Sequence, residues 1–220
     1  MKPSELRARL ESSAFAFRGY NVTNLGRTPE LLEHPAYGAT VRECLDSASV
    51  VCADVTGKPT DLVGRVERRE ETSLETYAEA VALVMAVEHA QIRILAEQFG
   101  IEMKQAQFSL GYSLGEITAV ALSGVIDLHE AMRVPLTLAE DCAELAHDVT
   151  LGVLFSRGKL LPLNAIRKLC LEINQTGQGV IGLSAVLSPN SILLMGQGDT
   201  LDRFKEAMSQ FPERMSLRKN

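Results

Sequence analysis

The sequence of 220 residues predicts an α/β protein in two parts, a main body over residues 1–147 and a smaller α+β subdomain over residues 148–220. Two observations predict it. Up to about His147, short apolar runs with strand character are separated by long helical patterns. From Thr150 onward the order is strand, helix, strand, strand, helix and strand, which is the ferredoxin-like order. We therefore expect a parallel-sheet main body that carries a ferredoxin-like subdomain.

The first half of the main body combines short elements with one long helix. We expect a short polar helix over residues 4–13, a buried strand over 14–17, a loop over 18–29, a helix over 37–53 and a polar surface connection over 56–71. Thr72 and Glu75 have the spacing of a capping box, and the helical pattern after them runs to Gly100. Because apolar residues nearly encircle this pattern, the helix should be buried on most sides.

The second half of the main body is expected to hold a strand over 105–110 and a helix through Ser123. Asp127 and Glu130 predict the start of another helix, interrupted by Pro135 and continuing to about His147. The subdomain should contain strands over 150–156, 179–187 and 191–196, helices over 162–177 and 200–211, and a last strand that starts near Arg214.

Composition and charge exclude several classes of function. Hydrophobic residues make up 46% of the chain and charged residues 23%, which is ordinary for a globular protein. The formal net charge of -6 argues against binding to nucleic acid or to an anionic membrane surface. No apolar run is long enough to span a bilayer, and the charged N-terminal sequence lacks the apolar core of a secretory signal. We therefore expect a cytoplasmic protein.

The cysteines and the other short motifs give no sign of a metal or a cofactor. Cys44, Cys52, Cys142 and Cys170 are scattered along the chain without CxxC spacing. In a cytoplasmic protein such cysteines are expected to be reduced core residues rather than disulfides or metal ligands. No metal site, dinucleotide site or phosphate-binding loop is predicted. We therefore expect no permanently bound cofactor.

The most informative stretch is Gly111-Tyr112-Ser113-Leu114-Gly115, between an expected strand and an expected helix. A serine between two glycines in this context is typical of a nucleophile elbow, a sharp turn that presents the hydroxyl at a helix N-terminus. Free backbone N–H groups there stabilise developing negative charge, and the N–H of Leu114 is the natural donor. Alternatively, Ser113 is simply the N-cap residue of the helix and the glycines are turn residues.

Three segments resemble one family. Residues 111–133, GYSLGEITAVALSGVIDLHEAMR, resemble the nucleophile segment of the acyl-carrier-protein S-malonyltransferases and of the acyltransferase domains of polyketide synthases. Residues 188–208 are similar to part of that family's ferredoxin-like insertion, and residues 15–26 occupy the place of its GQG loop. The resemblance implies a hydrolase-like parallel-sheet body with an inserted ferredoxin-like α+β subdomain.

The resemblance also implies a two-step acyl transfer in fatty-acid or polyketide biosynthesis. Ser113 would take a malonyl-type acyl group from acyl-CoA and pass it to the phosphopantetheine thiol of an acyl carrier protein. The oxyanion would be held by the backbone N–H of Leu114 and by that of Tyr20, which follows the loop glycine Gly19. A serine esterase or thioesterase on the same elbow, and a catalytically degenerate acyltransferase-like docking module, are the alternatives.

The sequence departs from the family pattern at several positions. Tyr112 stands where the family has a histidine, and the loop reads GYNVT in place of GQGSQ. Leu138 stands where the family has the arginine that pairs with the malonyl carboxylate, and the nearest arginine is Arg133. Ala185 and Leu187 replace family asparagines. Because leucine cannot pair with a carboxylate, we expect neutral acyl groups to compete well with malonyl.

The resemblance implies a catalytic histidine just after the ferredoxin-like subdomain. The general base is therefore expected to lie beyond Asn220, together with the rest of the main body. The histidines within the sequence are expected to be surface or structural residues: His34, His89, His129 and His147. On this interpretation, the sequence corresponds to the N-terminal two-thirds of an acyltransferase module.

Overall fold

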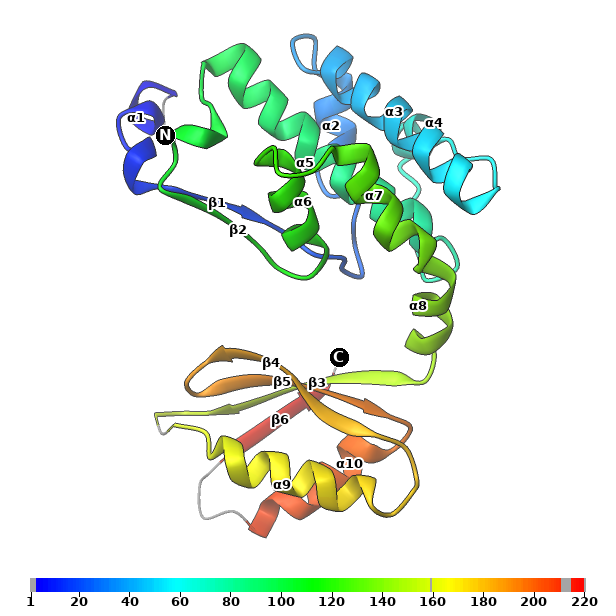
Figure 1. Ribbon diagram of the computed structural model, residues 1–220, viewed down its shortest axis with the longest axis vertical. Coiled ribbons are helices and arrows are strands. Elements are labelled where there is room, and N and C mark those ends of the chain that lie inside the picture. Colours follow the sequence, from blue (N-terminus) through cyan, green and yellow to red (C-terminus); the bar gives the residue numbers. More distant parts are fainter. Residues whose placement is uncertain (1–2, 159, 211–214, 220) are drawn as a thin grey trace. The chain divides into compact units, whose positions relative to one another are not determined.

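In the computed structural model the chain divides into two compact units, Met1–Ala143 and Glu144–Asn220 (Figure 1). The structure describes residues 3–158, 160–210 and 215–219. The first unit combines helices with a parallel pair of strands, and the second combines helices with an antiparallel sheet. The predicted α/β class, with a parallel sheet in the main body and an α+β subdomain, is confirmed. The sequence predicted the boundary between residues 147 and 148, and in the structure the two units divide between residues 143 and 144.

The first unit is rich in helices. Its elements are α1 (Pro3–Arg7), η1 (Leu10–Ser12), β1 (Ala14–Phe17), α2 (Thr28–Glu33), α3 (Gly38–Thr56), α4 (Leu62–Glu67), α5 (Tyr77–Phe99), η2 (Met103–Gln105), β2 (Phe108–Gly111), α6 (Leu114–Leu122), α7 (Leu128–Thr137) and α8 (Ala139–Ala146). The last of these crosses the boundary between the units. The strand predicted over 14–17 is β1, and the helix predicted over 37–53 is α3.

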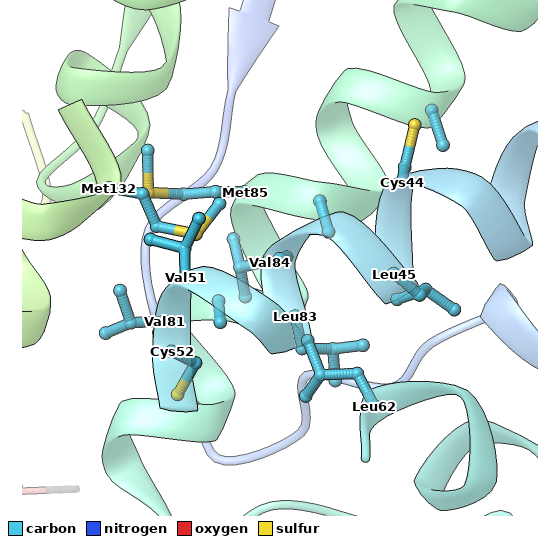
Figure 2. Packing of buried hydrophobic residues seen from close by; sticks show 14 of the residues in the cluster. Cys44, Leu45, Val51, Cys52, Leu62, Val81, Leu83, Val84, Met85 and Met132 are labelled. Carbon is cyan, nitrogen blue, oxygen red and sulfur yellow. The ribbon is translucent and has the colours of Figure 1, made fainter. Parts of the chain in front are cut away.

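Helix α5 forms the centre of the first unit. Every residue from Ala80 through Ala86 is buried, which spans almost two turns on all sides. Its side chains pack among residues of α3, α4 and α7, and Figure 2 shows Leu83 and Met85 beside Leu62 and Met132. The prediction that this helix is buried on most sides is confirmed.

The polar stretch over residues 56–71 is not a surface connection, and that prediction is wrong. It contains α4, and the core of the first unit includes three of its residues, Leu62, Val63 and Val66. Arg65 is buried beside them because its guanidinium pairs with the carboxylate of Glu79 at 2.8 Å. The many charges of this stretch concealed one buried face of a short helix.

The start of α5 also differs from the prediction. The helix begins at Tyr77, and the hydroxyl of Thr72 accepts a hydrogen bond from the side-chain amide of Asn24 at 3.0 Å. Thr72 therefore fastens an early loop and caps no helix. The capping box predicted from Thr72 and Glu75 is wrong. The predicted helix end is correct, since Gly100 takes the left-handed conformation at the C-cap with φ 59°.

Helix α7 starts as predicted. The carboxylate of Asp127 accepts from the backbone N–H groups of the first turn, at 2.8 Å for His129 and 3.2 Å for Glu130. Pro135 lies inside the helix, which ends at Thr137, and α8 then continues the chain. The predicted interruption is therefore present, a few residues after the proline.

The two strands of the first unit run parallel. The register places Ala14 opposite Phe108 and Phe17 opposite Gly111. In a parallel pair, the segments that follow both strands leave from the same edge of the sheet. Helix α6 follows β2 and packs back on both strands (Figure 1). This arrangement brings the residues after Phe17 close to the residues after Gly111.

The second unit has the predicted element order. Its elements are β3 (Val149–Ser156), α9 (Leu163–Asn174), β4 (Ile181–Ser188), β5 (Ser191–Gln197), α10 (Thr200–Ala207), η3 (Met208–Gln210) and β6 (Met215–Lys219). The strands lie in the order β4-β5-β3-β6, and each neighbouring pair is antiparallel (Figure 1). Residues 211–214, on which the predicted end of the second helix and start of the last strand fall, lie outside the described residues.

A separate core holds the second unit together. Leu154 and Leu194 from the sheet pack against Ile166 of α9 and Phe204 of α10, and all four are fully buried. The apolar residues of α9 and α10 lie on one stripe of each helix, which is what a helix covering one face of a sheet requires.

The cysteines only partly follow the prediction. All four are free, and Cys44, Cys52 and Cys170 are buried. Cys142 of α8 is exposed, so its prediction as a core residue is wrong. Within the described ranges, no helix has both the length and the apolar character that crossing a bilayer demands.

Candidate active site

The Gly111–Gly115 turn joins β2 to α6, as predicted. At its centre Ser113 has φ 55° and ψ -120°, a conformation that residues with a side chain rarely adopt. Such strain persists only where the surrounding structure enforces it. The backbone of Ser113 therefore has the strained turn expected of a nucleophile elbow.

The two flanking glycines explain how the strain is enforced. A Cβ atom on Gly111 would overlap the carbonyl group of Gly115 and the backbone nitrogen of Glu116. A Cβ atom on Gly115 would overlap the backbone carbonyls of Phe17 and Arg18. Both glycines are therefore required by close approach of backbone to backbone rather than by a positive φ.

The Ser113 side chain is exposed and does not cap the helix. Among the described residues its hydroxyl has no hydrogen-bond partner, and α6 starts without a side-chain cap at this position. Ser113 thus occupies the N-cap position that the alternative interpretation gave it, but its side chain makes no capping hydrogen bond. The hydroxyl is accessible at the N-terminus of α6, where helix dipole and free N–H groups favour negative charge.

The loop after β1 lies directly against this turn. The N–H of Tyr112 donates to the carbonyl of Phe17 at 3.0 Å. A Cβ atom on Gly19 would lie 2.8 Å from the carbonyl oxygen of Tyr112 and 3.1 Å from the Cβ of Ser113. The backbone at Gly19 thus touches the serine, and Tyr20 is the next residue along the chain.

Two backbone donors remain available near the serine. Among the described residues, neither the N–H of Leu114 nor the N–H of Tyr20 donates a hydrogen bond to the protein. Leu114 is the first residue of α6, and Tyr20 follows the loop glycine that packs on Ser113. These are the two donors that the sequence predicts for an oxyanion, and the structure leaves both unpaired.

The loop that carries Tyr20 is held from several sides. The ring of Tyr20 meets the ring of Tyr77 edge to face, with centroids 4.9 Å apart. Farther along, Asn24 is buried, and its backbone N–H donates to the Glu71 carboxylate at 2.8 Å. Burial raises the pKa of Glu71, but the backbone N–H groups that it accepts from lower this pKa further, so the net shift is downward. Glu71 therefore stays ionised and keeps the loop fixed.

Sequence reasoning missed one charged residue beside the site. Glu88 lies on α5 and is 7% exposed, and its Oε1 accepts from the N–H of Arg18 at 2.7 Å. Burial raises its pKa, and the nearby Thr118 hydroxyl and Arg18 N–H lower this pKa in part. A glutamate inside an otherwise apolar helical pattern was the signal that marked it in the sequence.

Sequence analysis singled out Leu138 and Arg133 in relation to the acyl carboxylate, and neither offers a free positive charge in the structure. Leu138 is half-exposed at the C-terminal end of α7. Arg133, the nearest arginine in sequence, pairs with Asp54 of α3 at 2.7 Å and lies 3.7 Å from Glu130. Arg133 is therefore already neutralised. In the second unit, Ala185 and Leu187 lie in β4, where Leu187 is exposed and Ala185 is partly buried.

None of the histidines of the first unit bonds to Ser113. His34 stacks on Tyr37, and His129 hydrogen-bonds to Ser47 at 2.8 Å. His89 lies 3.7 Å from the Cys44 sulfur, and burial lowers its pKa. All three are occupied by neighbours elsewhere in the unit. Over the described residues, no group of three or more His, Cys, Asp or Glu side chains could hold a metal ion.

Comparisons with known proteins agree with this geometry. An acyl carrier protein S-malonyltransferase from Vibrio cholerae superimposes with a TM-score of 0.68 at 22% identity, over 94% of this chain and 62% of the other. The acyltransferase domain from module 8 of the salinomycin polyketide synthase gives a TM-score of 0.69 at 20% identity, over 94% of this chain and 44% of the other. The fold is that of the malonyl-transfer acyltransferases. The resemblance inferred from the sequence is confirmed at this level.

A curated relative points in the same direction. Erythronolide synthase EryA3 of Saccharopolyspora erythraea is 26% identical over 187 residues, which are 85% of this chain and 5% of the synthase. The chain thus spans a small part of that synthase and less than two-thirds of the bacterial S-malonyltransferase. No protein-family profile matches the sequence.

Proposed function

We propose that the protein is an acyltransferase that moves a malonyl-type acyl group from acyl-CoA to the thiol of an acyl carrier protein, in fatty-acid or polyketide biosynthesis. The observation that carries the proposal is Ser113, exposed and unbonded on a strained elbow beside two unpaired backbone N–H groups. The fold shared with malonyl-transfer enzymes supports the reaction class. A cytoplasmic location and the absence of a resident cofactor are parts of the same proposal.

The first half-reaction forms an ester on the serine. The Ser113 oxygen attacks the thioester carbonyl while its proton passes to a general base, the histidine that the family resemblance implies, and the C–S bond then breaks as this base protonates the departing CoA sulfur. The oxyanion of the tetrahedral intermediate accepts hydrogen bonds from the N–H groups of Leu114 and Tyr20. In the second half-reaction, the carrier thiol attacks the ester, and Ser113 recovers its proton.

The acyl group is the least constrained part of this proposal. Leu138 offers no charge to a malonyl carboxylate, and Arg133 is paired with Asp54. A carboxylate buried without a partner is disfavoured by several kcal/mol, on the order of the desolvation penalty of one ion. We therefore expect acetyl and other neutral acyl groups to compete well with malonyl.

Intact-mass measurement tests the proposal. The full-length protein is incubated with malonyl-CoA, acetyl-CoA and longer neutral acyl-CoAs, and we expect a single acyl adduct that Ser113→Ala abolishes. Ser123→Ala serves as the matched control, because Ser123 is exposed at the other end of α6 and bonds only to a backbone carbonyl. A strong preference for malonyl over acetyl would show that another cation binds the carboxylate.

The fate of the adduct separates the alternative functions. An ester that persists until a phosphopantetheine thiol is added, and then moves to it, supports acyl transfer. Rapid release of free acid would indicate an esterase or thioesterase. The absence of any adduct would leave a docking module, and an adduct that survives Ser113→Ala would overturn the assignment of the nucleophile.

A further inference from the structure

Glu88 is an unusual residue for its surroundings. It lies on α5, the central helix of the first unit, two residues after the run of buried residues that ends at Ala86. A carboxylate removed from water is destabilising unless its oxygens are hydrogen-bonded. Oε2 of Glu88 is buried and has no hydrogen-bond partner among the described residues. A buried polar atom without a partner in a native structure calls for an explanation in terms of what the rest of the group does.

The other oxygen binds the backbone of the loop after β1. Oε1 of Glu88 accepts from the N–H of Arg18 at 2.7 Å, across 70 residues of sequence. A separation of 2.7 Å is at the short end of the range for N–H···O hydrogen bonds. Arg18 is two residues before Tyr20, and the intervening Gly19 packs on Ser113. Glu88 therefore fixes the start of the loop that contains Tyr20, the predicted oxyanion donor.

The same carboxylate also faces the helix that carries the other donor. Thr118 of α6 is completely buried, and its hydroxyl is one of the groups that stabilise the ionised form of Glu88. That hydroxyl lies 3.5 Å from the carbonyl of Leu114, one turn earlier in α6. Glu88 thus lies near both Arg18, at the start of the Tyr20 loop, and Thr118 of α6, the helix that begins at Leu114.

We propose that Glu88 is a positioning residue: by accepting from the Arg18 N–H it aligns the Tyr20 N–H with the oxyanion formed at Ser113. The inference rests on the proposed acyl transfer, because it assigns a role within that site. Loss of one oxyanion donor typically lowers the rate of the chemical step about 10²–10³-fold. A small displacement of the donor also lowers this rate, but by less than its complete loss. The predicted effect is on the rate of acylation and not on the binding of acyl-CoA.

The test compares two substitutions at this position. Glu88→Leu keeps a side chain of similar volume but removes the hydrogen-bond acceptor. Glu88→Gln keeps one side-chain oxygen, which can still accept the hydrogen bond. We expect Glu88→Leu to lower the maximal rate of acyl-Ser113 formation by about 10- to 100-fold with little change in the acyl-CoA concentration at half-maximal rate. Glu88→Gln should stay within about threefold of the unaltered protein, since the hydrogen bond to Arg18 is retained.

A matched control lies on the same helix. Glu97 of α5 pairs with Arg93 at 2.9 Å, away from the loop. Glu97→Leu should leave the acylation rate unchanged. Hydrogen exchange supplies a readout that does not depend on activity: amides of residues 18–24 should exchange faster in Glu88→Leu than in Glu97→Leu.

Every outcome of these experiments either supports or overturns the positioning role of Glu88. If the unaltered protein forms no adduct, the proposed function fails, and the exchange measurement alone decides the positioning role. If Glu88→Leu leaves loop exchange unchanged, or its folded fraction acylates at the normal rate, the inference is overturned. If Glu88→Leu does not fold, a loss of more than tenfold in Glu88→Gln, which keeps the acceptor, overturns it.

Discussion

The two units use their sheets in different ways. In the second unit all neighbouring strands are antiparallel, so the C-terminal ends of neighbouring strands lie at opposite edges, and the sheet packs against α9 and α10. In the first unit β1 and β2 are parallel, so the segments that follow them meet at one edge. Two short parallel strands are thus sufficient to place the Arg18–Tyr20 loop beside Ser113. The antiparallel sheet gives a self-contained fold, and the parallel pair gives a site.

The largest effects should come from the two separate cores. Phe204→Ala in α10 should destabilise the second unit by about 3–5 kcal/mol, and Leu83→Ala in α5 should destabilise the first by about 2–5 kcal/mol, because both side chains are fully buried. Hydrogen exchange should show faster exchange mainly in the unit that carries the substitution. Equal acceleration in both units after either substitution would mean that the two units unfold as one.

Glycine substitutions should give an intermediate effect that again differs between units. Gly111→Ala forces a Cβ into the backbone of Gly115 and should lower the free energy of unfolding by roughly 1–3 kcal/mol. It should also abolish acylation of Ser113. Gly182→Ala in β4 meets nothing within 4 Å and should change stability by at most about 1 kcal/mol. Chemical denaturation measures both, and a Gly111→Ala variant with normal stability and acylation would contradict the close-packed turn.

The smallest effects should come from two aspartates at helix starts. Asp127→Ala removes an acceptor of two backbone N–H groups and should lower stability by about 1 kcal/mol. Asp199 precedes α10 without a cap hydrogen bond and makes an exposed ion pair with Arg203, so Asp199→Ala should lower stability by less than about 0.5 kcal/mol. Thermal denaturation should rank them in that order, and the reverse order would show that the cap on α7 contributes nothing.

The sequence predicted the second unit well because its elements obey simple periodicities. Helix α9 buries Ile166, Cys170 and Ile173 on one stripe, and β5 alternates buried and partly exposed residues. The first unit was harder because local signals competed there with long-range contacts. Threonine is a residue type that often caps helices, yet the hydrogen-bond partner of Thr72, Asn24, is far away in the sequence. No local pattern can reveal such a partner.

The candidate site also contains residues that local sequence patterns predicted and residues that they did not. Ser113 and its glycines were predicted from a five-residue pattern, because the turn makes its demands locally. Tyr20 was predicted through the family resemblance alone, since no local rule connects the end of β1 to the end of β2. Glu88 was missed, because its role depends on a contact with Arg18 that only the folded chain creates.

The contacts at Gly115 have an evolutionary consequence. Its Cα approaches the carbonyls of Phe17 and Arg18, so loop and elbow meet through peptide groups with no side chain between them. Substitution of the exposed Tyr112 side chain should then leave the position of the serine unchanged. Substitutions of exposed side chains can therefore accumulate around the serine, whereas a side chain at either glycine would displace the turn itself. Divergence at this site is therefore expected to be gradual in specificity and abrupt in loss.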